Sequence, residues 1–206
     1  MLTDPSPPFL HDRSHKMSKR YLSFAGLPVA FALAALTGGT RSLAAQADAP
    51  AVAQAPALDD PTIVAIFDNA NSFDIETGKL AAKRGHSNEV RQFGAMLARD
   101  HEMVRQQGRD LAKKLGVTPT PPAGDQSARD QAATLHRLGA LRGAEFDRAF
   151  LQHEATFHRD VIAAIKSTLL PAIKNEELKA LVVKVAPAFQ AHLDMAENLG
   201  KRVATK

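Results

Sequence analysis

Residues 87–116 read SNEVRQFGAMLARDHEMVRQQGRDLAKKLG, and this stretch decides the fold. Ser87 is a helix N-cap residue, and Gly116 is the residue type that ends helices. Between them, apolar and small residues recur at alternating spacings of four and three, which is the period of one helix face. These residues are Val90, Gly94, Leu97, His101, Val104, Gly108, Leu111 and Leu115. The pattern predicts one long amphipathic helix, whose two glycines allow close approach of a second helix.

The segment before this helix has the same character. Asp60 followed by Pro61 predicts a cap and a first helical residue, and Gly85 predicts the end of that helix. After Gly116 the chain is rich in proline and glycine up to residue 126, which predicts a loop.

Three further helices are expected beyond the loop. A short one runs from Ser127, in capping-box spacing with Asp130, to about Leu138. A long one begins near Ala144 and ends at Leu170. The last is capped by Asn175, reaches Gly200 and contains Pro187, which predicts a kink.

Four long amphipathic helices and one short one predict an all-α protein, a four-helix bundle with one additional short helix and a kinked last helix. No stretch alternates with period two for long enough to indicate a strand. The bundle domain is expected over residues 60–202, with an Ala/Pro-rich linker over 45–59 and a tail over 203–206.

The N-terminal 44 residues are typical of a leader with a secretory signal peptide. Residues 19–47 contain Lys-Arg, an apolar run over 21–36 and small residues that predict cleavage after Ala44 or Ala47. Met17 makes a better start of this signal than Met1. The apolar run falls short of the ~20 residues that span a bilayer. We therefore expect export to the periplasm or cell envelope, with no integral membrane span after cleavage.

Composition excludes several functional classes. The chain has 206 residues, a formal net charge of +4 and no cysteine, which excludes disulfides, thiol nucleophiles and thiolate metal sites. Most of the positive charge lies in the first 44 residues, so the domain lacks the basic surface that nucleic-acid binding requires. A basic amphipathic helix with Trp or Tyr, as membrane-surface binding requires, is also missing.

Each of the four long helices carries one potential metal ligand on its apolar stripe. These residues are Asp74, His101, His158 and His192. Imidazole and carboxylate suit Zn, Cu(II), Fe or Ni, and bundle metal sites take ligands from facing helices. The sequence therefore predicts an interior His/carboxylate cluster that binds a metal ion or small ligand, in a role such as envelope stress tolerance. His86 and His136 are expected to be solvated.

Two alternatives remain open. The histidines could be core residues that hydrogen-bond to Asp100, Glu154 or Asp74 and only fix helix packing in a non-catalytic interaction or structural module. Acid–base catalysis would need an accessible cleft at the cluster. No residue is assigned a catalytic role.

Two known metal motifs do not fit. His153 and His158 flank a glutamate, as in a zinc-protease signature, but five residues place them on different helix faces. A Glu-x-x-His pair, which di-iron bundles use, is absent from the sequence.

Four segments resemble an exported bacterial family. They are residues 73–82 (FDIETGKLAA), 90–101 (VRQFGAMLARDH), 146–151 (FDRAFL) with His158, and 186–193 (APAFQAHL). The family is domain of unknown function four-one-four-two, often labelled as outer membrane proteins. The resemblance covers roughly residues 60–202 and implies a ferritin-like helical bundle in the periplasm or envelope, without an established activity.

The resemblance also bears on the candidate site. The family's motif histidines fall on His101, His158 and His192, so His153 is incidental. The family's usual glutamate falls on Asp74, which is one methylene shorter, and a common tyrosine falls on Phe150.

Overall fold

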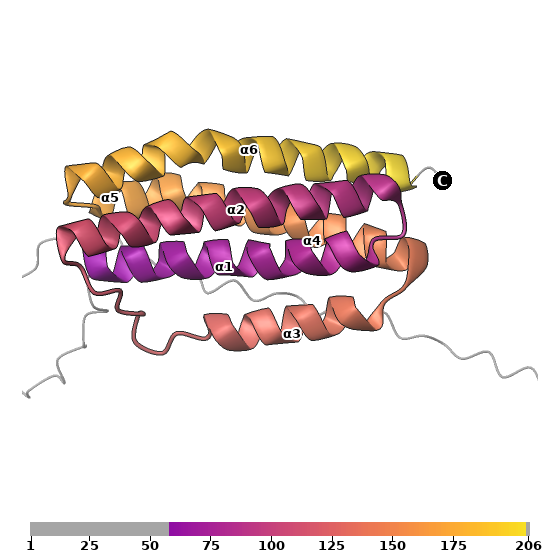
Figure 1. Ribbon diagram of the computed structural model, residues 1–206, viewed down its shortest axis with the longest axis horizontal. Coiled ribbons are helices and arrows are strands. Elements are labelled where there is room, and N and C mark those ends of the chain that lie inside the picture. The colour runs from indigo at the N-terminus through magenta and orange to yellow at the C-terminus, as the bar shows by residue number, and fades with distance from the viewer. Residues whose placement is uncertain (1–57, 205–206) are drawn as a thin grey trace, which may run out of the picture. The chain divides into compact units, whose positions relative to one another are not determined.

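The computed structural model describes residues 58–204, which form helices and connecting turns without a strand (Figure 1). The predicted leader, both cleavage positions and most of the linker lie outside the described residues. The elements are α1 (Asp60–Arg84), α2 (Asn88–Leu115), α3 (Ser127–Ala140), α4 (Gly143–Ala164), the π-helix η1 (Ile165–Leu169), α5 (Leu170–Ala172) and α6 (Glu176–Ala204). The all-α prediction is confirmed.

The long helices pair as two antiparallel hairpins, α1 with α2 and α4 with α6 (Figure 1). The loop after α2 and helix α3 carry the chain back along the outside of the bundle, so that α2 and α4 run in the same direction. One such crossover is the connectivity of ferritin-like four-helix bundles. None of the described helices is both long enough and apolar enough to cross a membrane.

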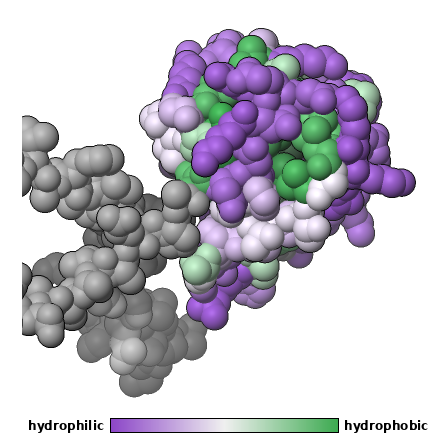
Figure 2. Space-filling view, turned by 90° about the vertical axis from the view of Figure 1, so that its left-hand side faces the viewer, coloured by the Kyte–Doolittle hydropathy of each residue, from purple (hydrophilic) through white to green (hydrophobic). Residues whose placement is uncertain are grey.

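The core consists of two hydrophobic clusters separated by a polar layer. One cluster includes Ile63, Val182 and Phe189, and the other includes Leu97 and Phe146. All but one of the buried polar residues of the described chain lie between them along the helices: Asn71, Asp74, Thr77, His101, Glu154, His158 and His192. The exception is Asp147, near the start of α4. At the end of the bundle where α5 lies, hydrophobic residues show between hydrophilic ones (Figure 2).

Glycines bring α1 and α2 into backbone contact. A Cβ on Gly94 would lie 2.6 Å from the carbonyl oxygen of Gly78. A Cβ on Gly108 would lie 2.7 Å from the ring of Phe67. The prediction that Gly94 and Gly108 permit close approach is confirmed.

Most predicted caps are confirmed. Ser87 accepts from the N–H of Val90, and the Asn175 side chain accepts from the N–H groups of Glu177 and Leu178. Gly116 ends α2 in the left-handed conformation, with φ 64°.

Two predicted caps are wrong. Asp59, not Asp60, caps α1, because the carboxylate of Asp60 accepts from the N–H groups of Lys174 and Asn175 across the bundle. The predicted Ser127–Asp130 capping box does not form either. Asp125 accepts from the N–H and hydroxyl of Ser127 instead.

The end of α4 also differs from the prediction. Regular α-helix stops at Ala164, and the π-helix η1 precedes α5, which contains Pro171. Proline cannot donate to the carbonyl four residues earlier and its ring crowds that carbonyl. The wider π turn accommodates the proline, so the chain stays helical as far as Ala172.

Helix α6 continues through Pro187 and ends at Ala204, four residues beyond the predicted end at Gly200. Its ribbon is bowed in Figure 1. Pro187 lacks the N–H that would bond the carbonyl of Val183, which accounts for a bend in a continuous helix.

Candidate metal centre

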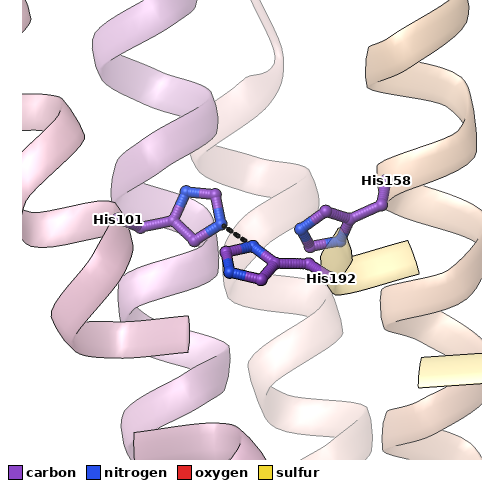
Figure 3. Close-up of side chains that lie close together, drawn as sticks. All are labelled: His101, His158 and His192. Carbon is purple, nitrogen blue, oxygen red and sulfur yellow. Dashed lines mark hydrogen bonds between the residues drawn. The ribbon is translucent and has the colours of Figure 1, made fainter. Parts of the chain in front are cut away.

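The four predicted ligand residues lie in the polar layer, one from each long helix. Asp74 comes from α1, His101 from α2, His158 from α4 and His192 from α6. All four are buried. The three histidines each offer a ring nitrogen, and these nitrogens lie within 4.8 Å of one another. Figure 3 shows the rings converging, with His192 between the other two.

The hydrogen bonds of Asn71 determine the tautomer of His101. The amide group of Asn71 donates to the carbonyl of Phe67 at 2.7 Å, so its oxygen faces Nδ1 of His101 at 2.9 Å. An amide oxygen only accepts, and Nδ1 of His101 therefore carries the proton. The Nε2 atom of His101 is left with a free lone pair directed into the layer.

The other two rings follow the same rule. Nε2 of His192 lies 3.3 Å from Oδ2 of Asp100, and Nδ1 of His158 lies 3.0 Å from the backbone carbonyl of Glu154. Each imidazole thus donates one N–H to an oxygen and keeps its other nitrogen bare. Metal-ligating histidines show this arrangement, because the outer hydrogen bond orients the ring and raises its basicity.

Two bare nitrogens face each other in the layer. Nε2 of His101 and Nδ1 of His192 are 3.2 Å apart, and the dashed line in Figure 3 marks this contact at hydrogen-bond distance. A hydrogen bond here would need a proton on one of the two atoms. With both outer nitrogens protonated, neither facing atom has a hydrogen to donate. Two lone pairs at this separation repel, and a cation held by both relieves the repulsion.

Two carboxyl groups complete the layer. Oδ2 of Asp74 lies 3.5 Å from Nε2 of His101, and ligand atoms of Asp74, Glu154 and His158 form a second group within 4.8 Å. Within the part of the chain that the structure describes, both carboxyl oxygens of Asp74 and Glu154 and Nε2 of His158 are buried without a hydrogen-bond partner. Buried polar atoms are normally satisfied, so these orphaned atoms call for an explanation.

Burial disfavours the charged form of every group in the layer. It lowers the pKa of His101 to about 2 and that of His158 to about 3, and it also lowers the pKa of His192. Burial raises the pKa of Glu154 to about 7 and the pKa of Asp74 well above its ordinary value. The imidazoles are therefore neutral, as ligands must be, and the two carboxyl groups can balance a +2 ion once ionised.

Sequence reasoning missed three members of the layer: Asn71, Thr77 and Glu154. Glu154 was considered only as a hydrogen-bond partner, although it lies four residues before His158 and therefore on the same helix face. Asn71 was not considered, although it lies three residues before Asp74.

The other histidines within residues 58–204 lie outside the layer. The His153 ring packs against the rings of Phe73 and Phe157. His86 and His136 are exposed, as predicted.

Comparison with known proteins places the chain in a family. Residues 44–199 match the family described as a domain of unknown function, DUF4142. The chain belongs to this family. None of the curated proteins matches it.

Two solved structures share the fold of this DUF4142 domain. One is the DUF305 fragment from Deinococcus radiodurans, with a TM-score of 0.60, 16% identity, and coverage of 71% of this chain and 99% of that one. The other is CopM in its Cu(II)-bound form, with a TM-score of 0.57, 14% identity, and coverage of 71% and 98%. At these identities the likeness concerns the fold.

The Phe-Asp element of this DUF4142 domain has a structural task. Asp147 is buried, and its carboxylate oxygens accept from the N–H groups of His86 and Ser87 at 2.8 Å each. Phe146 and Phe150 stack beside it in the core. This element therefore fixes the turn between α1 and α2 and lies apart from the polar layer.

Proposed function

We propose that this domain binds one divalent transition-metal ion in the polar layer. His101, His158 and His192 would supply three nitrogen ligands, and Asp74 would supply a carboxylate oxygen. Glu154 adds a second carboxyl group beside His158. The observation that carries the proposal is that three bare ring nitrogens converge while each ring donates its other N–H to an oxygen.

The donor atoms favour particular metals. Nitrogen and oxygen donors of this kind suit Cu(II), Zn, Ni and Fe, whereas Cu(I) prefers thiolate and thioether sulfur. The chain has no cysteine, and Met103 and Met195 are exposed rather than in the layer. The fold likeness to CopM, which was solved in a Cu(II)-bound form, supports testing Cu(II) first.

The proposed role is to hold the ion rather than to catalyse a reaction with it. The candidate ligands are buried on all sides, and Phe189 packs its ring against those of His101 and His158. Such a layer suits retention of an ion rather than access of a substrate. With the signal peptide expected over 19–47, we propose that the protein binds metal in the cell envelope and contributes to metal-stress tolerance.

Metal titration of the purified, metal-free protein tests this proposal. We expect one equivalent of Cu(II) or Zn to bind, with a rise in melting temperature, because an ion that binds only the folded state stabilises it. For Cu(II), electron paramagnetic resonance should show coupling to imidazole nitrogens. His158→Leu should abolish both signals, whereas His153→Leu, which removes a partly buried histidine outside the layer, should preserve them.

The opposite result would overturn the proposal. Absence of bound metal, together with no thermal shift from Cu(II), Zn, Ni or Fe(II), would leave the histidines as packing residues of an interaction or structural module.

A further inference from the structure

We infer that the ion reaches the polar layer through the seam between α2 and α6, and that Asp100 is the positioning residue that receives it and passes it to His192. This inference rests on the proposed metal binding. It adds an access route and a residue outside the ligand set.

The burial of the layer identifies the route. The side chains of Asp74 and His101 are each 1% exposed, and those of Glu154 and His158 are fully buried. The side chain of His192 is 6% exposed, and it contacts Asp100, which is 24% exposed. Among the candidate ligands, His192 is therefore the one nearest to solvent, and Asp100 lies on its outer side.

A continuous chain of polar contacts joins this point to the surface. Oδ2 of Asp100 lies 3.3 Å from Nε2 of His192, and Oδ1 of Asp100 binds Nε and Nη2 of Arg99 at 2.9 Å each. The side chain of Arg99 is 66% exposed. The carboxylate of Asp100 therefore has one oxygen toward the layer and one toward a displaceable surface cation.

The packing of the helices agrees with this route. An open groove of about 670 Å³ lies between α2 and α6. Asp100 and His192 do not line it, but Met96, one turn before Asp100, and Ala191, next to His192, do. The α1–α2 seam, by contrast, is closed by backbone contact at Gly78 and Gly94.

Charge explains what each residue would do. A carboxylate at the mouth of a low-dielectric site raises the local concentration of cations and so raises the association rate. Arg99 occupies that carboxylate and opposes an approaching cation. The incoming ion therefore displaces Arg99 from Asp100, and movement of the His192 side chain then admits the ion to the layer.

Stopped-flow measurement of Cu(II) binding, with release into a chelator, separates this role from a merely structural one. Asp100→Asn keeps an oxygen acceptor for His192 and removes only the charge. We expect about tenfold slower association, with the stoichiometry of one ion unchanged. Asp100→Glu should restore much of the rate, and Arg99→Gln should raise it severalfold.

Matched variants control for general charge effects. Asp110→Asn makes the same charge change at an exposed position of α2, and Arg129→Gln does so for arginine on α3; both should leave the rates unchanged. If Asp100→Asn binds at the wild-type rate but releases faster, Asp100 only holds the His192 ring, and the inference is wrong. If the wild-type protein binds no ion, the proposed function fails with it.

Discussion

Gly78 of α1 and Gly94 of α2 meet backbone to backbone: a Cβ on Gly78 would lie 2.7 Å from the carbonyl oxygen of Gly94. This contact lies one turn from Asp74 and two turns from His101, the two residues whose side chains approach to 3.5 Å. The close approach of the two helices therefore positions half of the candidate site.

Gly94→Ala tests this relationship. The added methyl group would lie 2.7 Å from both the Cβ of Ala81 and the backbone nitrogen of Ala82, so the helices must separate. We expect a loss of about 1–3 kcal/mol in the free energy of unfolding, measured by urea denaturation. Gly200→Ala, where nothing lies within 4 Å, should be neutral or slightly stabilising, and equal effects at both positions would contradict this account.

His101→Leu should affect the metal-free and metal-loaded proteins differently. Without metal, leucine removes a bare nitrogen that faces His192 but also leaves the buried amide oxygen of Asn71 without its donor. These effects oppose each other, so the melting temperature should change little. With metal, the variant should lose the stabilisation that the wild-type protein gains. A large loss of stability in the metal-free variant would show that the imidazole itself holds the core together.

Glu154→Gln should change the pH dependence of stability in the metal-free protein. Burial raises the pKa of Glu154 from 4.5 to about 7, so the folded state holds a proton that the unfolded state has released between these values. The contribution of Glu154 is complete below pH 4.5 and is lost as the pH rises to about 7. Denaturation at several pH values measures this change. The free energy of unfolding of the variant, relative to that of the wild type, should rise from pH 4.5 to about 7 and stay constant above pH 7.

The histidines act in the opposite direction. Burial lowers the pKa of His101 and His158 from 6.5 to about 2 and about 3, so the unfolded state binds protons that the folded state excludes. Their contribution is present above pH 6.5 and is lost as the pH falls, which opposes the effect of Glu154 in the wild-type protein. The comparison with Glu154→Gln isolates the carboxyl group, because both proteins keep these histidines.

Asp147→Ala should destabilise the fold without changing metal stoichiometry. The substitution leaves the N–H groups of His86 and Ser87 without their acceptor, which costs about 1–3 kcal/mol. Asp60→Ala makes the equivalent change at the turn before α6 and should cost less, because Asp60 is only partly buried whereas Asp147 is buried. Thermal unfolding and metal titration of both variants check these expectations. A loss of metal binding in Asp147→Ala at temperatures where it is folded would contradict the separation of this turn from the polar layer.

Local sequence signals predicted the helices well. Ser87, Gly116 and Asn175 act through their immediate neighbours, so their roles follow from sequence. Asp60 could not be assigned in this way, because its partners are more than a hundred residues away. The π-helix before Pro171 likewise reflects a compromise between a local proline and packing of the surrounding helix in the core.

The candidate site was partly predictable for the same reason. Helical periodicity placed His101, His158 and His192 on interior faces, and the structure brings them together. Periodicity does not show which hydrogen bonds a buried group finds. Glu154 does lie beside a histidine, but its backbone carbonyl is the atom within hydrogen-bond distance of His158 Nδ1, and its carboxylate lies 3.6 Å from that atom without a hydrogen bond.

The division of the bundle into two hairpins has a consequence for unfolding. The α1–α2 hairpin carries Asp74 and His101, whereas the α4–α6 hairpin carries Glu154, His158 and His192. An ion bound by residues of both hairpins would hold the two hairpins together. They could not separate without releasing the ion. Cleavage of the backbone within residues 116–126 would then yield two fragments that associate more tightly in the presence of metal than in the presence of a chelator.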